Sequence, residues 1–300
     1  VNNYAVTGHC WTAQGLVVVA TARSDASVPS PDVHSNTIVA GAINSASLPA
    51  ATYGATLTRN GTVSTARQVG TFRNNIFRDS FNNDLLKVND RASGILIEGN
   101  LFYNPGENDE AIDLNAVKNV TVQDNVFFRD YAGSSRPIPS TAQEGSDIVV
   151  KNSPCQWDAA FCNAWTLNIT IRRNVFLSWQ GGLSSNFIRL GEDNTPAFEA
   201  QDVVIENNLM IGNSDVTIEA PIAVTASKNV AVRHNTITGN LPSLAYVLHL
   251  DAAAYRTESV AIDNNIWSDP AGTMENFVLG DAADLSLIRL ERNAYWNGGQ

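Results

Sequence analysis

The residues of this chain that could do chemistry recur at matching places in short stretches where apolar and polar residues alternate. If these stretches stack as strands, about 4.8 Å apart, polar side chains from neighbouring stretches can act together on one ligand. A wall that faced only water would also carry mixed charges, so the stripe predicts either a binding groove or a solvated face. Its candidate residues are Lys87, Asn89, Asp113, Asn115, Lys151, Arg189, His249 and Asp251. Stacked in register, the segments place them in two rows, which are Lys87, Asp113, Val149, Arg189, Ala223, His249 and Val278, and two residues further on Asn89, Asn115, Lys151, Gly191, Thr225, Asp251 and Gly280.

Carboxylates gather in one loop that leads into this stripe. The loop PGENDEAIDLN contains Glu107, Asp109 and Glu110 and continues to Asp113. Four carboxylates close together repel one another unless water solvates them or a cation bridges them. Their spacing does not fit a twelve-residue EF-hand loop. The sequence therefore predicts either a solvated acidic loop or a cation site, and the loop GEDN at 191–194 is a weaker case of the same kind.

Other catalytic chemistries receive less support. His249 could serve as a general acid or base, because imidazole titrates near neutral pH, although an outward-facing histidine is more often only solvated. Hydrolysis by paired carboxylates is not indicated, because Val149 stands where an acidic partner of Asp113 would be needed. The chain has no GxSxG, nucleotide-binding, HExxH or CxxC motif, which argues against serine esterases, nucleotide-using enzymes and zinc enzymes.

The elements that must position these residues follow a repeat marked by asparagine. Each repeat has an apolar residue three positions before the asparagine and another two positions after it. A repeat with period-two alternation inside each unit is typical of a β-solenoid. The shortest spacing between the asparagines is 25 residues, and longer spacings carry loop insertions. The nine asparagines are Asn36, Asn75, Asn100, Asn125, Asn174, Asn208, Asn235, Asn265 and Asn293.

The recurring asparagine has a physical reason. At a sharp bend an asparagine tolerates left-handed backbone geometry, and its amide can bond local backbone groups. In stacked coils the amides can also bond one another as a ladder. The aromatic residues that follow, such as Phe102, Phe127 and Phe176, are then expected to stack inside the coil. We therefore predict an all-β chain with about 8–10 coils of roughly 25 residues, plus loop insertions.

The repeat predicts one domain over residues 1–300, because each coil of a solenoid stacks only on its neighbours. Residues 1–65 are expected to form irregular N-terminal coils, and residues 66–296 regular ones. No capping element follows the last ladder asparagine, and solenoids need capped ends. We therefore expect a part of a larger secreted protein, with further domains or end-to-end self-association.

Composition limits the partners. The net charge is −11 and the isoelectric point is near 4.7, so a nucleic-acid partner, which requires clustered Lys and Arg, is not expected. No apolar run is long enough to span a membrane. Cys155 and Cys162 lie in one expected loop and predict a local disulfide in an extracellular protein, with two free thiols as the alternative. Cys10 is left over.

Over about residues 30–296 the pattern resembles the right-handed parallel β-helix superfamily, the pectate-lyase-like fold. The resemblance implies a right-handed parallel β-helix. That superfamily is dominated by polysaccharide lyases and glycoside hydrolases, and it also contains phage tailspikes, adhesins and other surface proteins. Because one fold serves many functions, the resemblance favours work on carbohydrates without establishing it.

Two segments resemble family-six polysaccharide lyases, the chondroitinase B and alginate lyase group. EGSDIVVKNS resembles the strand of the catalytic lysine, and NVFLSWQGGLSSNFIRLGED resembles the strand of the assisting arginine. The resemblance implies Lys151 as the base and Arg189 as its partner. A desolvated lysine beside a cation can have its pKa lowered toward neutrality, as a general base requires. The chain departs from the pattern after Arg189, where Leu190 and Gly191 replace an expected basic residue.

The resemblance also implies Ca²⁺ as a cofactor. Its candidate ligands are Asp113, Glu144 and Asp147, and Lys87, Asn89, Asn115 and Asp251 are candidate substrate-binding residues. The expected function is a secreted or surface protein that acts on a polysaccharide or cell-surface glycan, as a calcium-assisted lyase that cleaves uronate-containing chains by β-elimination. The alternative is a non-catalytic extracellular module with a structural, adhesive or filament-forming role.

Overall fold

The fold is built from short parallel strands. Among the described residues the structure has 27 strands, one short 3₁₀ helix at Ser153–Gln156 and no α-helix. The N-terminal coils are described only at their strands, and the expectation of irregular coils over residues 1–65 therefore lies largely outside the described residues. The computed structural model describes residues 16–19, 32–34, 37–39, 55–58, 70–78, 84–89, 91–105, 110–130, 145–179, 185–213, 218–241, 243–250, 255–280 and 288–298.

Every third strand of the chain joins the same sheet, so the chain winds through three sheets in turn. Each sheet has nine parallel strands, which confirms a β-helix within the expected number of coils. Sheet A, the first of the three, contains the stretches that carry the candidate chemistry. Its strands are β1 (Leu16–Val19), β4 (Ala55–Thr58), β7 (Leu86–Asn89), β10 (Ile112–Asn115), β13 (Ile148–Lys151), β16 (Ile188–Leu190), β19 (Ile222–Val224), β22 (Ser243–Leu250) and β25 (Met274–Leu279).

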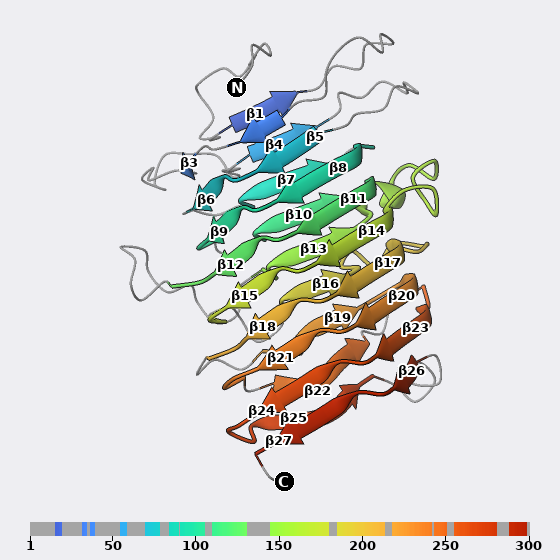
Figure 1. Ribbon diagram of the computed structural model, residues 1–300. Coiled ribbons are helices and arrows are strands. Elements are labelled where there is room, and N and C mark those ends of the chain that lie inside the picture. The colour runs from blue at the N-terminus through green and yellow to red at the C-terminus, as the bar shows by residue number, and fades with distance from the viewer. Residues whose placement is uncertain are drawn as a thin grey trace, which may run out of the picture.

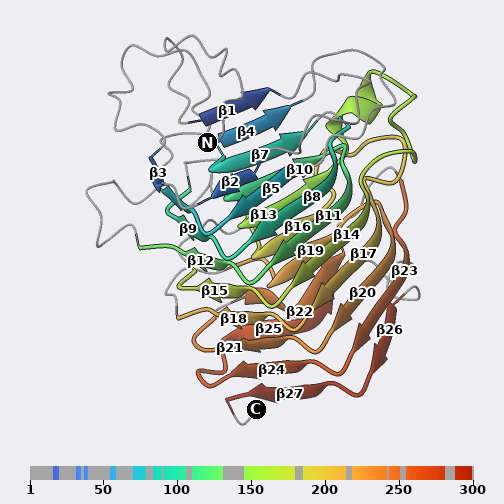
Figure 2. The same ribbon diagram turned by 45° about the horizontal axis from the view of Figure 1, so that its top comes forward.

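Sheet B is formed by the segments that precede the ladder asparagines. Figure 2 shows it as a curved wall running the length of the coil stack. Its strands alternate between buried and partly exposed residues, as expected for one face on the core and one in water. They are β2 (Asp32–His34), β5 (Gly70–Arg73), β8 (Ser93–Glu98), β11 (Lys118–Gln123), β14 (Leu167–Arg172), β17 (Ala200–Glu206), β20 (Ser227–Arg233), β23 (Glu258–Asp263) and β26 (Ile288–Glu291).

Sheet C follows the asparagines and leads back to sheet A. From β6 to β27 the second residue of each strand points inward, which is why an aromatic or large apolar side chain recurs there. The strands are β3 (Thr37–Val39), β6 (Ile76–Arg78), β9 (Leu101–Tyr103), β12 (Val126–Phe128), β15 (Val175–Leu177), β18 (Leu209–Ile211), β21 (Thr236–Thr238), β24 (Ile266–Asp269) and β27 (Ala294–Asn297).

The asparagine ladder and the aromatic stack are both present. The Nδ2 of Asn100 donates to Oδ1 of Asn125 at 2.9 Å, and Asn125 donates to Asn174 at 3.0 Å. The ring centroids of Phe102 and Phe127 lie 5.0 Å apart and nearly parallel. Neighbouring coils therefore pack in register through matched buried side chains, as predicted.

One detail of the ladder prediction is wrong. From Asn75 to Asn293, the left-handed backbone geometry belongs to the residue before each ladder asparagine and not to the asparagine itself. Asp124, with a φ of 57°, precedes Asn125, and Arg173, with a φ of 53°, precedes Asn174. The asparagine side chain is free to bond along the stack because its neighbour makes the bend.

Candidate functional site

Ionisable side chains are buried on the outward face of sheet A. Ile112 and Leu114 of β10 belong to the hydrophobic core, so the alternate residues Asp113 and Asn115 point away from it. Asp113 is nevertheless fully buried, as is Val149 on the next coil. The described outward residues of β8 and β14 on sheet B are partly exposed instead.

Strand pairing confirms most of the predicted stripe. Lys87 pairs with Asp113, Asp113 with Val149, and Val149 with Arg189. Arg189 in turn pairs with Ala223 and Ala223 with His249. The second row is confirmed from Asn89 through Asn115 to Lys151.

The stripe ends differently from the prediction, which placed Val278 beside His249. Leu279 pairs with His249, because the register shifts between Ala245 and Leu248 of β22. Asp251 and Glu144 lie outside the described residues, as do Glu107, Asp109 and Cys10. For Asn89 and His249 only the backbone is described, so their predicted roles stay predictions.

Two lysines flank the buried Asp113 carboxylate from the coils on either side. The Nζ of Lys87 lies 2.5 Å from Oδ2 of Asp113 and 3.3 Å from Oδ2 of Asp84. The Nζ of Lys151 lies 3.6 Å from the same Asp113 oxygen and 2.5 Å from Oε2 of Glu192. Strand stacking thus joins three successive coils and the loop after β16 into one charged cluster.

Three carboxylates of this cluster crowd one another. Asp84, Glu110 and Asp113 are buried, and each offers an oxygen within 4.8 Å of the others. The backbone N–H of Glu110 donates to Oδ1 of Asp84 at 3.1 Å. Burial, followed by the nearby Asp84 carboxylate, raises the pKa of Glu110 well above its usual range. Burial also raises the pKa of Asp113, although both lysines oppose this.

The side chains around the two lysines raise their pKa values, whereas a general base requires a lowered one, so the expected lowering depends on the cation. Burial would lower the pKa of Lys151, but the carboxylates of Asp113, Glu110 and Glu192 outweigh it and raise the pKa above its ordinary value. The pKa of Lys87 is raised in the same way by Asp113 and Asp84. Both side chains are therefore ammonium ions at neutral pH.

The acidic group fits a hard divalent cation by its chemistry. Carboxylate oxygens are the ligands that Ca²⁺ prefers, and three of them converge at Asp84, Glu110 and Asp113. With Glu192 included, four carboxylates face two ammonium groups, so the ionised cluster carries excess negative charge. A cation would offset this excess.

The predicted ligand set for calcium is only partly brought together. Asp113 belongs to the acidic group, whereas Asp147 bonds the Nε of Arg129 at 2.8 Å. Arg129 is buried, its guanidinium lies over the ring of Trp179, and it also donates to the carbonyl of Gly145. This buried pair anchors the chain before β13. Asp147 is therefore bonded to Arg129 and does not belong to the acidic group that could bind a metal ion.

Arg189, the predicted partner of Lys151, lies on the same face one coil further on. Its Nη1 is 3.5 Å from Oε2 of Glu219 and 3.5 Å from Oδ1 of Asn186, and its Nε donates to the carbonyl of Gly191 at 3.2 Å. The guanidinium is thus bonded to its own coil and to the one that follows.

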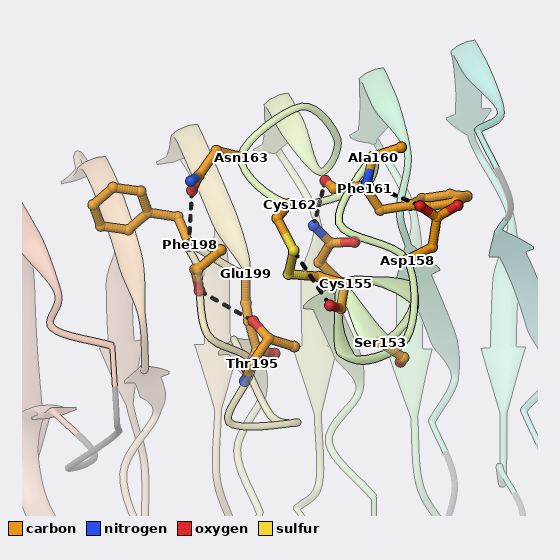
Figure 3. Close-up of a disulfide and its surroundings, with 12 residues drawn as sticks. Ser153, Cys155, Asp158, Ala160, Phe161, Cys162, Asn163, Thr195, Phe198 and Glu199 are labelled. Carbon is orange, nitrogen blue, oxygen red and sulfur yellow. Dashed lines mark hydrogen bonds between the residues drawn. A yellow bond between two sulfur atoms is a disulfide. The ribbon is translucent and has the colours of Figure 1, made fainter.

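The predicted disulfide between Cys155 and Cys162 is present and holds a loop beside the C-terminal ends of sheet A. In Figure 3 this loop lies next to the segment that carries Thr195, Phe198 and Glu199. Further contacts tie it to neighbouring coils. The Nδ2 of Asn115 donates to Oγ of Ser153 at 2.8 Å, Oγ of Ser153 donates to Asp193 at 2.5 Å, and the backbone N–H of Phe198 donates to Asn163 at 3.1 Å.

The sequence prediction did not identify Asp84 as a site residue, and it noted Glu192 only as part of a weaker acidic loop and not as a partner of Lys151. Asp84 stands two positions before β7, as Glu110 does before β10, so alignment of the repeats would have placed the two side by side. Glu192 belongs to the GEDN loop, whose carboxylates are noted in the sequence, but the ion pair with Lys151 depends on how that loop folds.

Comparison with known proteins adds no functional assignment. No protein-family model, no curated protein and no solved structure matches this chain. Within the described parts of the chain, no helix is long and apolar enough to cross a membrane. The geometry of the cluster on sheet A is therefore the basis for a functional proposal.

Proposed function

We propose that this protein is a secreted carbohydrate-active β-helix protein that cleaves an acidic polysaccharide by β-elimination on the outward face of sheet A. The observation that carries the proposal is the pairing of two lysines with the buried Asp113 across successive coils, beside the buried carboxylates of Asp84 and Glu110. Buried ionisable groups with perturbed pKa values are characteristic of catalytic sites. The disulfide at Cys155 and Cys162 supports secretion, because such bonds persist in oxidising compartments.

In this proposal Lys151 is the base. Its amine takes the proton from the carbon next to the uronate carboxylate, the electron pair forms a carbon–carbon double bond, and the glycosidic carbon–oxygen bond breaks. The departing oxygen then takes a proton. Arg189 lies on the same face and supplies positive charge near that oxygen. Lys151 must first lose its own proton, which the surrounding carboxylates oppose.

The residues that would hold a divalent cation are Asp84, Glu110 and Asp113. When bound, the cation would neutralise the uronate carboxylate and offset the attraction of these three residues for the lysines. Lys87 would remain beside Asp84 and Asp113, where it orients the acidic group. Asn115 and Ser153 would border the ligand at the C-terminal ends of the strands.

The test is product formation from alginate, pectin and chondroitin, with and without Ca²⁺, followed by the ultraviolet absorbance of unsaturated uronate. We expect Lys151→Ala to abolish the product while the far-ultraviolet circular dichroism stays unchanged. Lys228→Ala is the matched control, because Lys228 pairs with Glu258 on sheet B. Absence of unsaturated product from all three polymers, with either salt condition, would refute the lyase proposal.

A non-catalytic adhesive or structural module is the second candidate. It is favoured by the fact that Lys87 and Lys151 are already paired with carboxylates and have raised pKa values. This alternative predicts glycan binding or self-association without product release, and Lys151→Ala would leave both unchanged. Analytical ultracentrifugation and glycan-array binding, measured for the unchanged protein and for Lys151→Ala, distinguish this alternative from the lyase.

A further inference from the structure

The loop after β16 has a backbone held by buried contacts, and it carries the partly exposed side chain of Glu192. Glu199 is fully buried, and its carboxylate accepts from the backbone N–H groups of Glu192, Asp193 and Thr195 at 2.8, 2.9 and 2.9 Å. Gly191, with a φ of 77°, begins the loop so close to the carbonyl of Thr225 that a Cβ atom would lie 2.2 Å from that oxygen. The loop backbone is therefore held in place from both sides.

The side chain of Glu192 is the most exposed carboxylate of the charged cluster. It is 32% exposed, whereas Asp84 and Asp113 are at 0%. Its described partner is Lys151, 2.5 Å away. Rotation of this side chain alone, without movement of the loop, would uncover the Lys151 ammonium. A partly desolvated ammonium that loses one carboxylate is a binding site for another.

We propose that Glu192 is a specificity-determining residue that occupies, with its own carboxylate, the place at Lys151 that a carboxylate of the incoming ligand takes while Lys151 still carries its proton. Glu199 is the positioning residue that holds Glu192 there. The inference rests on the proposed function, since it takes an acidic glycan as the ligand. A neutral glycan has no group that can replace Glu192, so the loop favours ligands that bring a carboxylate of their own.

The test compares calorimetric binding of a uronate oligosaccharide with that of its methyl ester, in the presence of Ca²⁺. In Glu192→Gln the competing charge is gone and the side-chain shape is kept. We expect the uronate to bind about tenfold more tightly, a change of the size expected for one part-buried charge contact. The methyl ester should bind as it does to the unchanged protein.

Glu206→Gln is the matched control, because Glu206 forms a similar cross-coil pair with Arg233 on sheet B. It should leave both affinities unchanged. Equal or weaker uronate binding by Glu192→Gln, or no binding by either protein, would overturn the inference about Glu192. Product formation by the unchanged protein is scored separately, so a working lyase whose Glu192→Gln variant binds normally would refute the inference and leave the proposed function standing.

Discussion

The substitution Asp113→Asn tests the charged cluster most directly. It removes the carboxylate between Lys87 and Lys151 and leaves two mostly buried ammonium groups facing a neutral amide. Loss of one partner from a buried ion pair costs about 3–5 kcal/mol. Burial raises the pKa of Asp113, which shows that its charge is itself costly to bury. We therefore expect the low end, a loss of about 3 kcal/mol in the free energy of unfolding at neutral pH.

A double-mutant cycle separates this effect from a general disturbance of β10. Lys87→Met, Asp113→Asn and the double variant are compared by urea unfolding, with hydrogen exchange of the β10 and β13 amides as a local measure. The double variant should lose less than the sum of the two single losses, by about 2 kcal/mol. The exposed pair of Asp124 and Arg173 provides the control, since Asp124→Asn should cost less than about 1 kcal/mol. Additive losses in the cycle would refute the coupling read from the structure.

Two further predictions concern buried polar groups. The pKa of Glu110 is higher in the folded protein than in the unfolded chain, so the folded state binds the proton of this carboxyl group more tightly. The free energy of unfolding therefore falls as the pH rises from the unfolded pKa through the folded pKa. Glu110→Gln should remove this fall and stabilise the protein at neutral pH, as thermal unfolding across acid and neutral pH will show; an unchanged pH dependence would contradict it. Asn125→Ala should cost about 2 kcal/mol in urea unfolding, because the orphaned groups of Asn100 and Ile97 stay buried. Exposed Asn119→Asp should cost little, because aspartate also tolerates the φ of 52° at that position.

Much of the fold could be predicted from the sequence because its signals are local and repeated. Alternation of apolar residues sets which side of a strand faces inward, and the constant spacing around Asn100 and Asn125 sets the register between coils. Alignment of the alternating segments upstream of the asparagines therefore placed Lys87, Asp113 and Lys151 together correctly. The same alignment placed Val278 wrongly beyond β22, because an irregularity within a strand leaves no mark in the repeat.

The electrostatics of the site could not be predicted in the same way. The sign of the shift in the pKa of Lys151 depends on Glu192 and Glu110, which approach from two different coils. The approach of Glu192 depends in turn on Glu199, whose role as an acceptor of three backbone N–H groups has no sequence signature. A candidate residue can be placed on a face by periodicity, whereas its protonation state depends on loops that periodicity does not describe.

The contrast between the two charged faces supports a role for sheet A beyond stability. Cross-coil pairs on sheet B, such as Glu206 with Arg233 and Asp263 with Arg289, are partly solvent-exposed and contribute little. The cluster around Asp113 is buried, and burial of a charge network is often no more stabilising than apolar packing of the same volume. Val149 and Ala223 show that this chain can place apolar residues in the same row of sheet A. Stability therefore gives no reason for charges at Asp113 and its neighbours, whereas the proposed binding of an acidic ligand or a cation would.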